Sequence, residues 1–169
     1  GCAPSIDTVV INVDPATTIA AAGPDQDLCN ATTATLAANV PAGSETGTWT
    51  EIPPGPAVIT DINDPTSGVT ALTIGGSATL RWTITSGFGG CAPTSEDVVI
   101  TSDPNPTTVI TPDPATVCAS VDIVLNGNPA GGSGTYTTHA WTGDTGPLSS
   151  TTIASPTLNG AANPYNLTY

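Results

Sequence analysis

Lysine and methionine are absent from the 169 residues, and the only basic side chains are one arginine and one histidine. They are outnumbered by 14 acidic residues, which give a formal net charge of −13. A chain with almost no cations cannot neutralise a phosphate backbone or an anionic lipid surface. We therefore exclude nucleic acid and acidic membranes as partners, and we expect copies of the chain to repel one another.

Long apolar runs and helical periodicity are also missing. No hydrophobic stretch approaches the length of about 20 residues that spans a bilayer, so no membrane insertion is expected. Aromatic residues make up 4% of the chain, which predicts a light core. Short alternating runs of Val, Ile and Thr, separated by Gly, Pro and Asn-Asp turns, predict an all-β protein.

An internal repeat organises the sequence. The motif GCAPSIDTVVI at Gly1–Ile11 returns as GCAPTSEDVVI at Gly90–Ile100. Two pairs of cysteines share the offset of 89 positions, namely Cys2 with Cys91 and Cys29 with Cys118. One period therefore contains one domain.

Proline-rich breaks divide the chain into three parts. Residues 1–15 are interpreted as the last strand of a preceding or neighbouring repeat, because Asp14-Pro15 breaks the strand pattern. Residues 16–104 form a complete immunoglobulin-like (Ig-like) repeat. Residues 105–169 form a further repeat that lacks its last strand.

The complete repeat contains seven strand candidates at a spacing of roughly ten residues, which predicts an Ig-like β-sandwich. They are Thr17–Ala22, Thr33–Asn39, Gly47–Ile52, Ala57–Ile62, Gly68–Ile74, Ser77–Thr85 and Glu96–Thr101.

The strand Ser77–Thr85 shows the clearest alternation and predicts the core. Ala78, Leu80, Trp82 and Ile84 face inward, and Trp82 is expected to pack against Trp49. Arg81 faces outward and is expected to pair with a carboxylate across the sheet.

The cysteines predict an extracellular disulfide, since no CxxC or Cys/His metal spacing is present. Cys29 and Cys91 bracket the complete repeat, and a bridge between them would close a loop of about 60 residues and contribute roughly 4 kcal/mol. Cys2 and Cys118 would pair with partners outside the chain or in neighbouring subunits.

The incomplete last repeat has two explanations. Tyr169 aligns with Trp82 at an offset of 87, so the sequence stops inside the sixth strand of that repeat. Either the chain is a window from a longer tandem array, or its N-terminal strand completes the unfinished sheet of an identical neighbour by strand addition.

Several motifs resemble the Ig-like and polycystic kidney disease-like (PKD-like) tandem repeats of giant Bacteroidota cell-surface proteins, including SprB-like gliding adhesins. They are AGPDQDLC from Ala22, GTWTE from Gly47, VTALTIGGSATLRWTI from Val69, GCAPTSEDVVIT from Gly90, YTTHAWTGD from Tyr136 and PTLNGAANPYNLTY from Pro156. The resemblance implies that residues 105–169 are a PKD-like repeat. It also implies type IX secretion, a place at the cell surface attached to the outer membrane, and a role in a stalk, filament or adhesin, as in gliding motility.

Catalytic and metal motifs are weak. His139 could be drawn into a triad with Ser133 and Asp144 or Asp122, but no nucleophile elbow is present, so we interpret it as a structural strand residue. Asp25 with Asp27, and Asp61 with Asp64, could bind Ca²⁺, yet no EF-hand pattern is present. We expect no cofactor.

Covalent modification is a separate hypothesis. Asp7-Thr8-Val9 resembles the short O-glycosylation motif of Bacteroidota, with Thr8 as the acceptor.

The function predicted from these features is a non-catalytic, extracellular repeat protein that forms a stalk or filament of a surface adhesin. Its partners would be neighbouring repeats or identical subunits, with surface polysaccharide as a further candidate. The alternative is a carbohydrate-binding accessory array of a secreted enzyme.

Overall fold

A computed structural model describes residues 1–2, 4–11, 13–88, 90–116, 118, 120–160 and 164–169. The chain divides into two compact units, residues 1–102 and residues 103–169. All regular structure in the described residues is strand, which confirms the predicted all-β class. No helix of these residues has the length and apolarity that crossing a bilayer requires.

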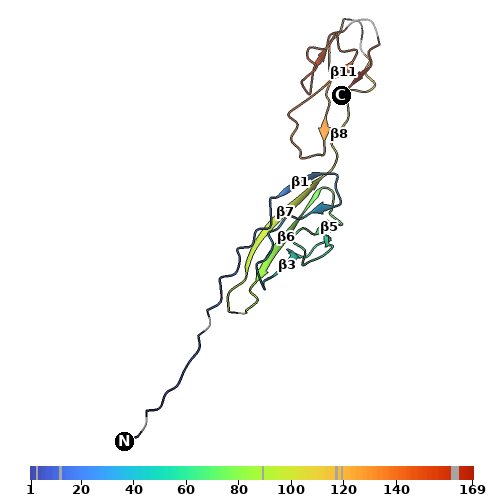
Figure 1. Ribbon diagram of the computed structural model, residues 1–169. Helices are drawn as coiled ribbons and strands as arrows, with labels where there is room; N and C mark the ends of the chain where they lie inside the picture. Colours follow the sequence, from blue (N-terminus) through green and yellow to red (C-terminus); the bar gives the residue numbers. More distant parts are fainter. Residues whose placement is uncertain (3, 12, 89, 117, 119, 161–163) are drawn as a thin grey trace. The chain divides into compact units, whose positions relative to one another are not determined.

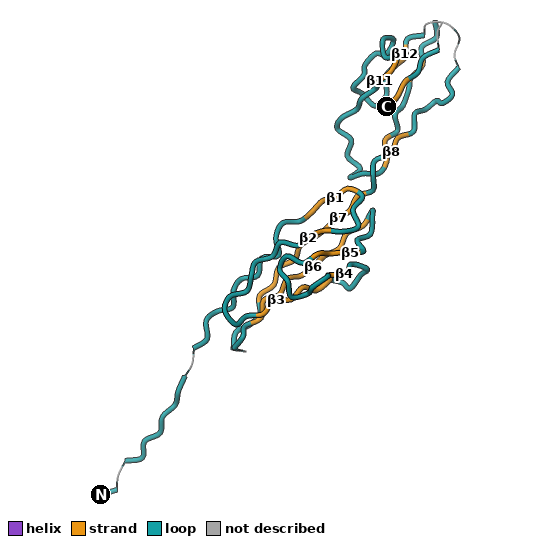
Figure 2. Tube along the Cα trace, turned by 45° about the vertical axis from the view of Figure 1, so that its right-hand side comes forward, coloured by secondary structure: helices purple, strands orange, loops and turns teal. Residues whose placement is uncertain are grey.

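Unit 1 contains two sheets (Figures 1 and 2). The larger has four strands in the order β1 (Gln26–Cys29), β7 (Thr94–Asp103), β6 (Gly76–Thr85) and β3 (Thr46–Glu51). The smaller has three, in the order β2 (Ala34–Thr35), β5 (Gly68–Thr70) and β4 (Val58–Ile59). The long strands β6 and β7 run antiparallel, with Leu80 opposite Val98.

Six of the seven predicted strands correspond to β2 to β7, and the first does not. Residues 17–22 form no strand, and β1 lies further along the chain, at Gln26–Cys29. The amides of Ala20 and Ala22 donate to side-chain oxygens of β7, those of Thr94 and Glu96. Bonds to side chains hold this stretch beside β7 without a backbone ladder, so alternation alone misplaced the strand.

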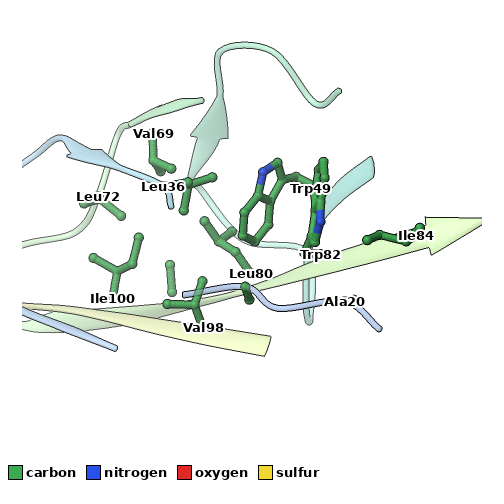
Figure 3. Packing of buried hydrophobic residues seen from close by; sticks show 12 residues of the cluster. Ala20, Leu36, Trp49, Val69, Leu72, Leu80, Trp82, Ile84, Val98 and Ile100 are labelled. Carbon is green, nitrogen blue, oxygen red and sulfur yellow. The ribbon is translucent and has the colours of Figure 1, made fainter. Parts of the chain in front are cut away.

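The predicted core of unit 1 is confirmed. Ala78, Leu80, Trp82 and Ile84 are all buried, and the rings of Trp49 and Trp82 lie 5.0 Å apart, tilted by 43° (Figure 3). Each indole N–H has a backbone acceptor, Asp64 O for Trp49 and Asn39 O for Trp82. Both rings are therefore buried with their polar atoms satisfied.

The position of the Trp82 ring explains why residue 47 is a glycine. A Cβ added to Gly47 would overlap the six-membered ring of Trp82. The close approach of β3 to the indole thus requires a residue without a side chain.

The described residues of unit 2 form three short strand pairs: β8 (Thr107–Thr108) with β10 (Pro129–Ala130), β9 (Ile123–Val124) with β12 (Thr157–Leu158), and β11 (Thr142–Gly143) with β13 (Leu167–Thr168). Trp141 and Tyr169 pack with ring centroids 4.8 Å apart. Trp141 is buried, and its indole N–H donates to Ile153 O. The pair repeats the arrangement of Trp49 and Trp82 in unit 1.

The N-terminal residues 1–15 differ in structure from residues 90–104, their counterpart in the internal repeat. The described residues among them form no strand, although the sequence predicts one that includes Asn12, which lies outside the described residues. Val9, Val10 and Ile11 are about four-fifths exposed. The strand-forming sequence has no sheet to join within its own unit.

Candidate functional site

The main functional candidate is a line of contacts along β7, which we call the β7 seam: residues 15–31 on one side and residues 91–102 on the other. At one end, the Cys91 thiol donates to Pro15 O at 3.3 Å and the Thr17 hydroxyl to Ala92 O at 2.9 Å. At the other end, Ala31 N donates to Ser102 Oγ at 3.1 Å. Residue numbers rise together on both sides, so the two segments run in the same direction.

Carboxyl side chains accept backbone hydrogen bonds in the middle of the seam. Glu96 Oε2 accepts from Ala22 N at 2.7 Å, and Asp25 Oδ1 accepts from Val99 N at 2.8 Å. Hydrogen bonds of amides to carboxylates are stronger than those between neutral groups. By its sequence position Asp25 is a candidate calcium ligand, and nothing in the sequence indicates the seam, because a parallel pairing of distant segments leaves no local pattern.

Glu45 ties the seam to the loop before β3. Its Oε1 accepts from Thr18 N at 2.8 Å, and its Oε2 accepts from Ala42 N at 2.9 Å. The hydrogen bonds from Thr18, followed by that from Ala42, hold the pKa of Glu45 below its ordinary value. The ionised carboxylate is therefore the form that joins the two segments.

Replacing Glu45 by glutamine is expected to destabilise unit 1 at neutral pH and to have no effect in acid. Because the folded pKa is lowered, the stabilisation is complete above the unfolded pKa of about 4.3 and is lost as the pH falls through the folded pKa. Urea unfolding at pH 7 and pH 3 measures this, with Asp27→Asn, a change at an exposed position of β1, as the control. An equal loss at both pH values would assign the effect to shape instead of charge.

The predicted carboxylate partner of Arg81 is Asp97, directly opposite on β7. Arg81 Nε and Nη2 donate to the two carboxylate oxygens at 2.6 Å and 2.8 Å. These bonds lower the pKa of Asp97 and raise that of Arg81. Both side chains are about two-fifths exposed, so the pair contributes little to stability.

The structure does not bring Cys29 and Cys91 together. Cys91 lies at the Pro15 end of the seam, whereas Cys29 lies between Asp25, bonded to Val99, and Ala31, bonded to Ser102. About nine residues of extended chain, roughly 30 Å, separate these positions along β7. A disulfide needs Cα atoms within about 7 Å, and none is present. The structure places the two cysteines at opposite ends of unit 1, so this arrangement gives the predicted intramodule bridge no support. Cys2 and Cys118 are exposed.

Thr8, the candidate glycosylation acceptor, is exposed and lies outside any strand, and its amide donates to Asp7 Oδ1 at 2.9 Å. The hydroxyl is accessible to a modifying enzyme, and the modification stays a prediction.

The acidic pairs considered for calcium serve turns and the seam. Asp61 Oδ1 accepts from Asn63 N, and Asp64 Oδ1 accepts from the amide and hydroxyl of Thr66. The bonds from Thr66 lower the pKa of Asp64. Within the described residues, no group of three or more His, Cys, Asp or Glu side chains could hold a metal ion.

His139 lies against Tyr169. The imidazole Nδ1 and the phenol oxygen are hydrogen-bonded, and the rings stack with centroids 5.8 Å apart. The carboxylates considered with it bind backbone amides, Asp144 that of Asn166 and Asp122 that of Gly160. The candidate triad is not assembled, and His139 has the structural role that the sequence favoured.

Known structures share this fold at very low sequence identity. No family model and no curated protein sequence matches the chain. The immunoglobulin domains 1–5 of Sidekick-1 match at a TM-score of 0.54 with 8% identity, covering 86% of this chain and 34% of that one. The four N-terminal Ig domains of Dscam1 isoform 6.9 match at 0.48 with 15% identity, covering 91% and 42%. The PKD domain of the KIAA 1837 protein matches at 0.39 with 20% identity, covering 54% and 93%.

The likeness to Sidekick-1 shows the fold of the chain, an all-β architecture of the Ig-like kind. The chain spans less than half the length of the Sidekick-1 and Dscam1 structures. At such identities the likeness concerns the fold alone.

Proposed function

We propose that the chain is part of a non-catalytic extracellular repeat protein that forms a stalk or filament of a bacterial surface adhesin. The β7 seam is the observation that carries this proposal. The chain enters unit 1 at Pro15, at one end of the seam, and leaves at Asp103, beyond the other end. Tension between these points pulls the two sides of the seam along their length, so the hydrogen bonds resist together instead of breaking one at a time.

The repeat and the charge support the same role. Two units of similar internal arrangement follow one another, as in a protein that gains length by repetition. The net charge of −13 keeps neighbouring stalks apart at low ionic strength.

The carbohydrate-binding alternative lacks a supporting surface in the described residues. Trp49, Trp82 and Trp141 are all buried. Phe88 is the aromatic side chain with high exposure, and it lies alone in the turn between β6 and β7. A sugar platform normally requires several exposed aromatic rings, so no observation favours this function.

Single-molecule force spectroscopy tests the stalk. Unit 1 is expected to resist a higher force when pulled through residues 15 and 103 than when pulled through residues 15 and 88. The second pair lies at one end of β7, so that pull would open the seam bond by bond. Similar forces in the two geometries would contradict the role assigned to the seam.

Two matched variants refine the measurement. Asp25→Ala and Glu96→Ala each remove a carboxylate acceptor from the seam, and both are expected to lower the unfolding force along the 15 to 103 axis. Asp27→Ala is the control: Asp27 is exposed on β1, and its replacement should leave the force unchanged.

A further inference from the structure

A small cleft opens between the two sheets of unit 1, at the end where β3 and β7 finish and β6 begins. Its volume is about 50 Å³. One side consists of Ala57, just before β4, and of Ala71 to Thr73, which follow β5. The other side consists of the start of β6 together with Ile100 and Ser102 of β7. A space of this size holds about three or four non-hydrogen atoms.

Hydrogen bonds hold the walls of the cleft in place. Leu72 and Ile100 are buried at the end of the core away from the two tryptophans (Figure 3). The amide of Leu72 donates to Thr32 O, and the amide of Gly75 donates to Ser102 O. Because these bonds fix the loop after β5 on both sides, the cleft exists before a ligand binds, which lowers the cost of binding.

The backbone of Ala71, which lines the cleft, has an unusual conformation. Its φ is +59°, in the left-handed region that residues with a side chain rarely adopt. Such outliers persist only where the surrounding structure enforces them, and they are concentrated at ligand sites and switch regions. The cleft is therefore marked by its backbone as well as by its shape.

Glu51 brings a carboxylate to this cleft. It shares the inward side of β3 with Gly47 and Trp49, which are buried, and is itself half-buried. One of its oxygens accepts from Gly55 N at 2.6 Å and the other from Ala57 N at 3.4 Å. A carboxylate has about four acceptor positions, so a ligand can still donate to Glu51.

Among the described residues, no cation pairs with Glu51. Glu51 is also the only charged residue of those that line the cleft. The one arginine, Arg81, lies on the outward side of β6, where both oxygens of Asp97 accept from it. A half-buried carboxylate of this kind favours a cationic ligand, and the apolar walls favour a cation that carries an alkyl group.

We propose that this cleft binds the end of a primary alkylammonium group, the chemistry of a lysine side chain. The ammonium donates to Glu51, and the last carbons of the alkyl chain lie between Leu72 and Ala78. The 169 residues contain no lysine, so the ligand comes from outside them, either as a lysine of a partner protein or as a free aliphatic amine. The site goes beyond the stalk role, because it gives unit 1 a selective contact that the β7 seam does not use.

A chemical-shift titration of the isotope-labelled full chain at pH 7 tests the proposal. The probes are Nα-acetyl-lysine-N-methylamide, called the lysine compound, and n-butylammonium. Each is expected to cause saturable shifts of the Ala57 and Leu72 amides, with a dissociation constant of about 1 mM for a contact of so few atoms. Tighter binding of the lysine compound would assign the site to a polypeptide partner, and tighter binding of n-butylammonium would assign it to a free amine.

An uncharged probe shows whether the ammonium matters. The norleucine compound has the same alkyl chain and the same backbone as the lysine compound but lacks the amine. It is expected to bind at least about tenfold more weakly, because a hydrogen bond to a charged group is lost. This comparison uses the unaltered chain, so it does not depend on how a variant folds.

Two variants separate the charge of the cleft from its shape. Glu51→Gln removes the charge at nearly constant size and is expected to weaken binding of the lysine compound about tenfold. Ala57→Leu fills the cleft and should abolish binding although Glu51 remains. Asp27→Asn is the matched control: it removes an exposed carboxylate of β1 that does not line the cleft, so binding should be unchanged.

Three results would overturn the proposal. The first is the absence of saturable shifts at Ala57 and Leu72 in the unaltered chain. The second is equal binding of the norleucine and lysine compounds, which would make the cleft a plain apolar site. The third is an equal loss of binding in Asp27→Asn and Glu51→Gln, which would show only a general attraction of cations to an acidic chain.

Discussion

Replacing Trp82 by alanine is expected to destabilise unit 1 by about 3–5 kcal/mol, the usual cost of truncating a buried aromatic side chain. Trp82 is completely buried at the centre of β6, packs against Trp49 and donates its indole N–H to Asn39 O. The change removes one of the two largest side chains of a light core and leaves a backbone acceptor without its donor. Since small domains are stable by only about 5–15 kcal/mol, much of unit 1 would be unfolded at moderate temperature.

Urea unfolding followed by the amide signals of β6 and β7 measures this loss. Trp82→Phe is the matched control, because it keeps an aromatic ring beside Trp49 and should cost less than the alanine variant. A loss below about 1 kcal/mol for Trp82→Ala would show that the ring does not anchor the core.

The sequence was sufficient where one face of a strand is buried. Alternation identified the inward residues of β6, and it placed Arg81 on the outer face, where Asp97 pairs with it. Burial of one face imposes a period of two along a strand, and this period is visible without a structure.

The sequence was insufficient where function depends on two segments running in parallel. Cysteine spacing suggested a bridge between Cys29 and Cys91, but the direction of β1 relative to β7 places them at opposite ends of the seam. The carboxylates of Glu45, Asp25 and Glu96 accept from backbone amides that are distant in sequence. Residue type does not reveal such contacts, because any turn or surface strand could carry the same acids.

The internal repeat relates the exposed N-terminal segment to the buried strand β7. Because Val9 and Ile11 repeat Val98 and Ile100, the burial seen in unit 1 shows what the exposed N-terminal segment is suited to. Their 82% and 79% exposure is unusual for strand residues with this alternation. The sequence alone left a window from a longer array and strand exchange as alternatives.

Replacing Trp141 by alanine is expected to unfold unit 2 without shifting the transition of unit 1. Among the described residues of unit 2, the buried apolar core contains little beyond Trp141, Leu125 and Pro156. Loss of the tryptophan removes the contact with Tyr169 and the bond to Ile153 O. A cost of about 3–5 kcal/mol would exceed what so small a core can supply.

Hydrogen exchange at Leu125 and at Leu80 reports the two units separately in one sample. Protection at Leu125 should disappear in Trp141→Ala while protection at Leu80 persists, and Trp82→Ala should give the reverse. Equal loss of protection in both units for either tryptophan variant would show that the two cores fold as one, and the stalk would then yield as a whole instead of one domain at a time.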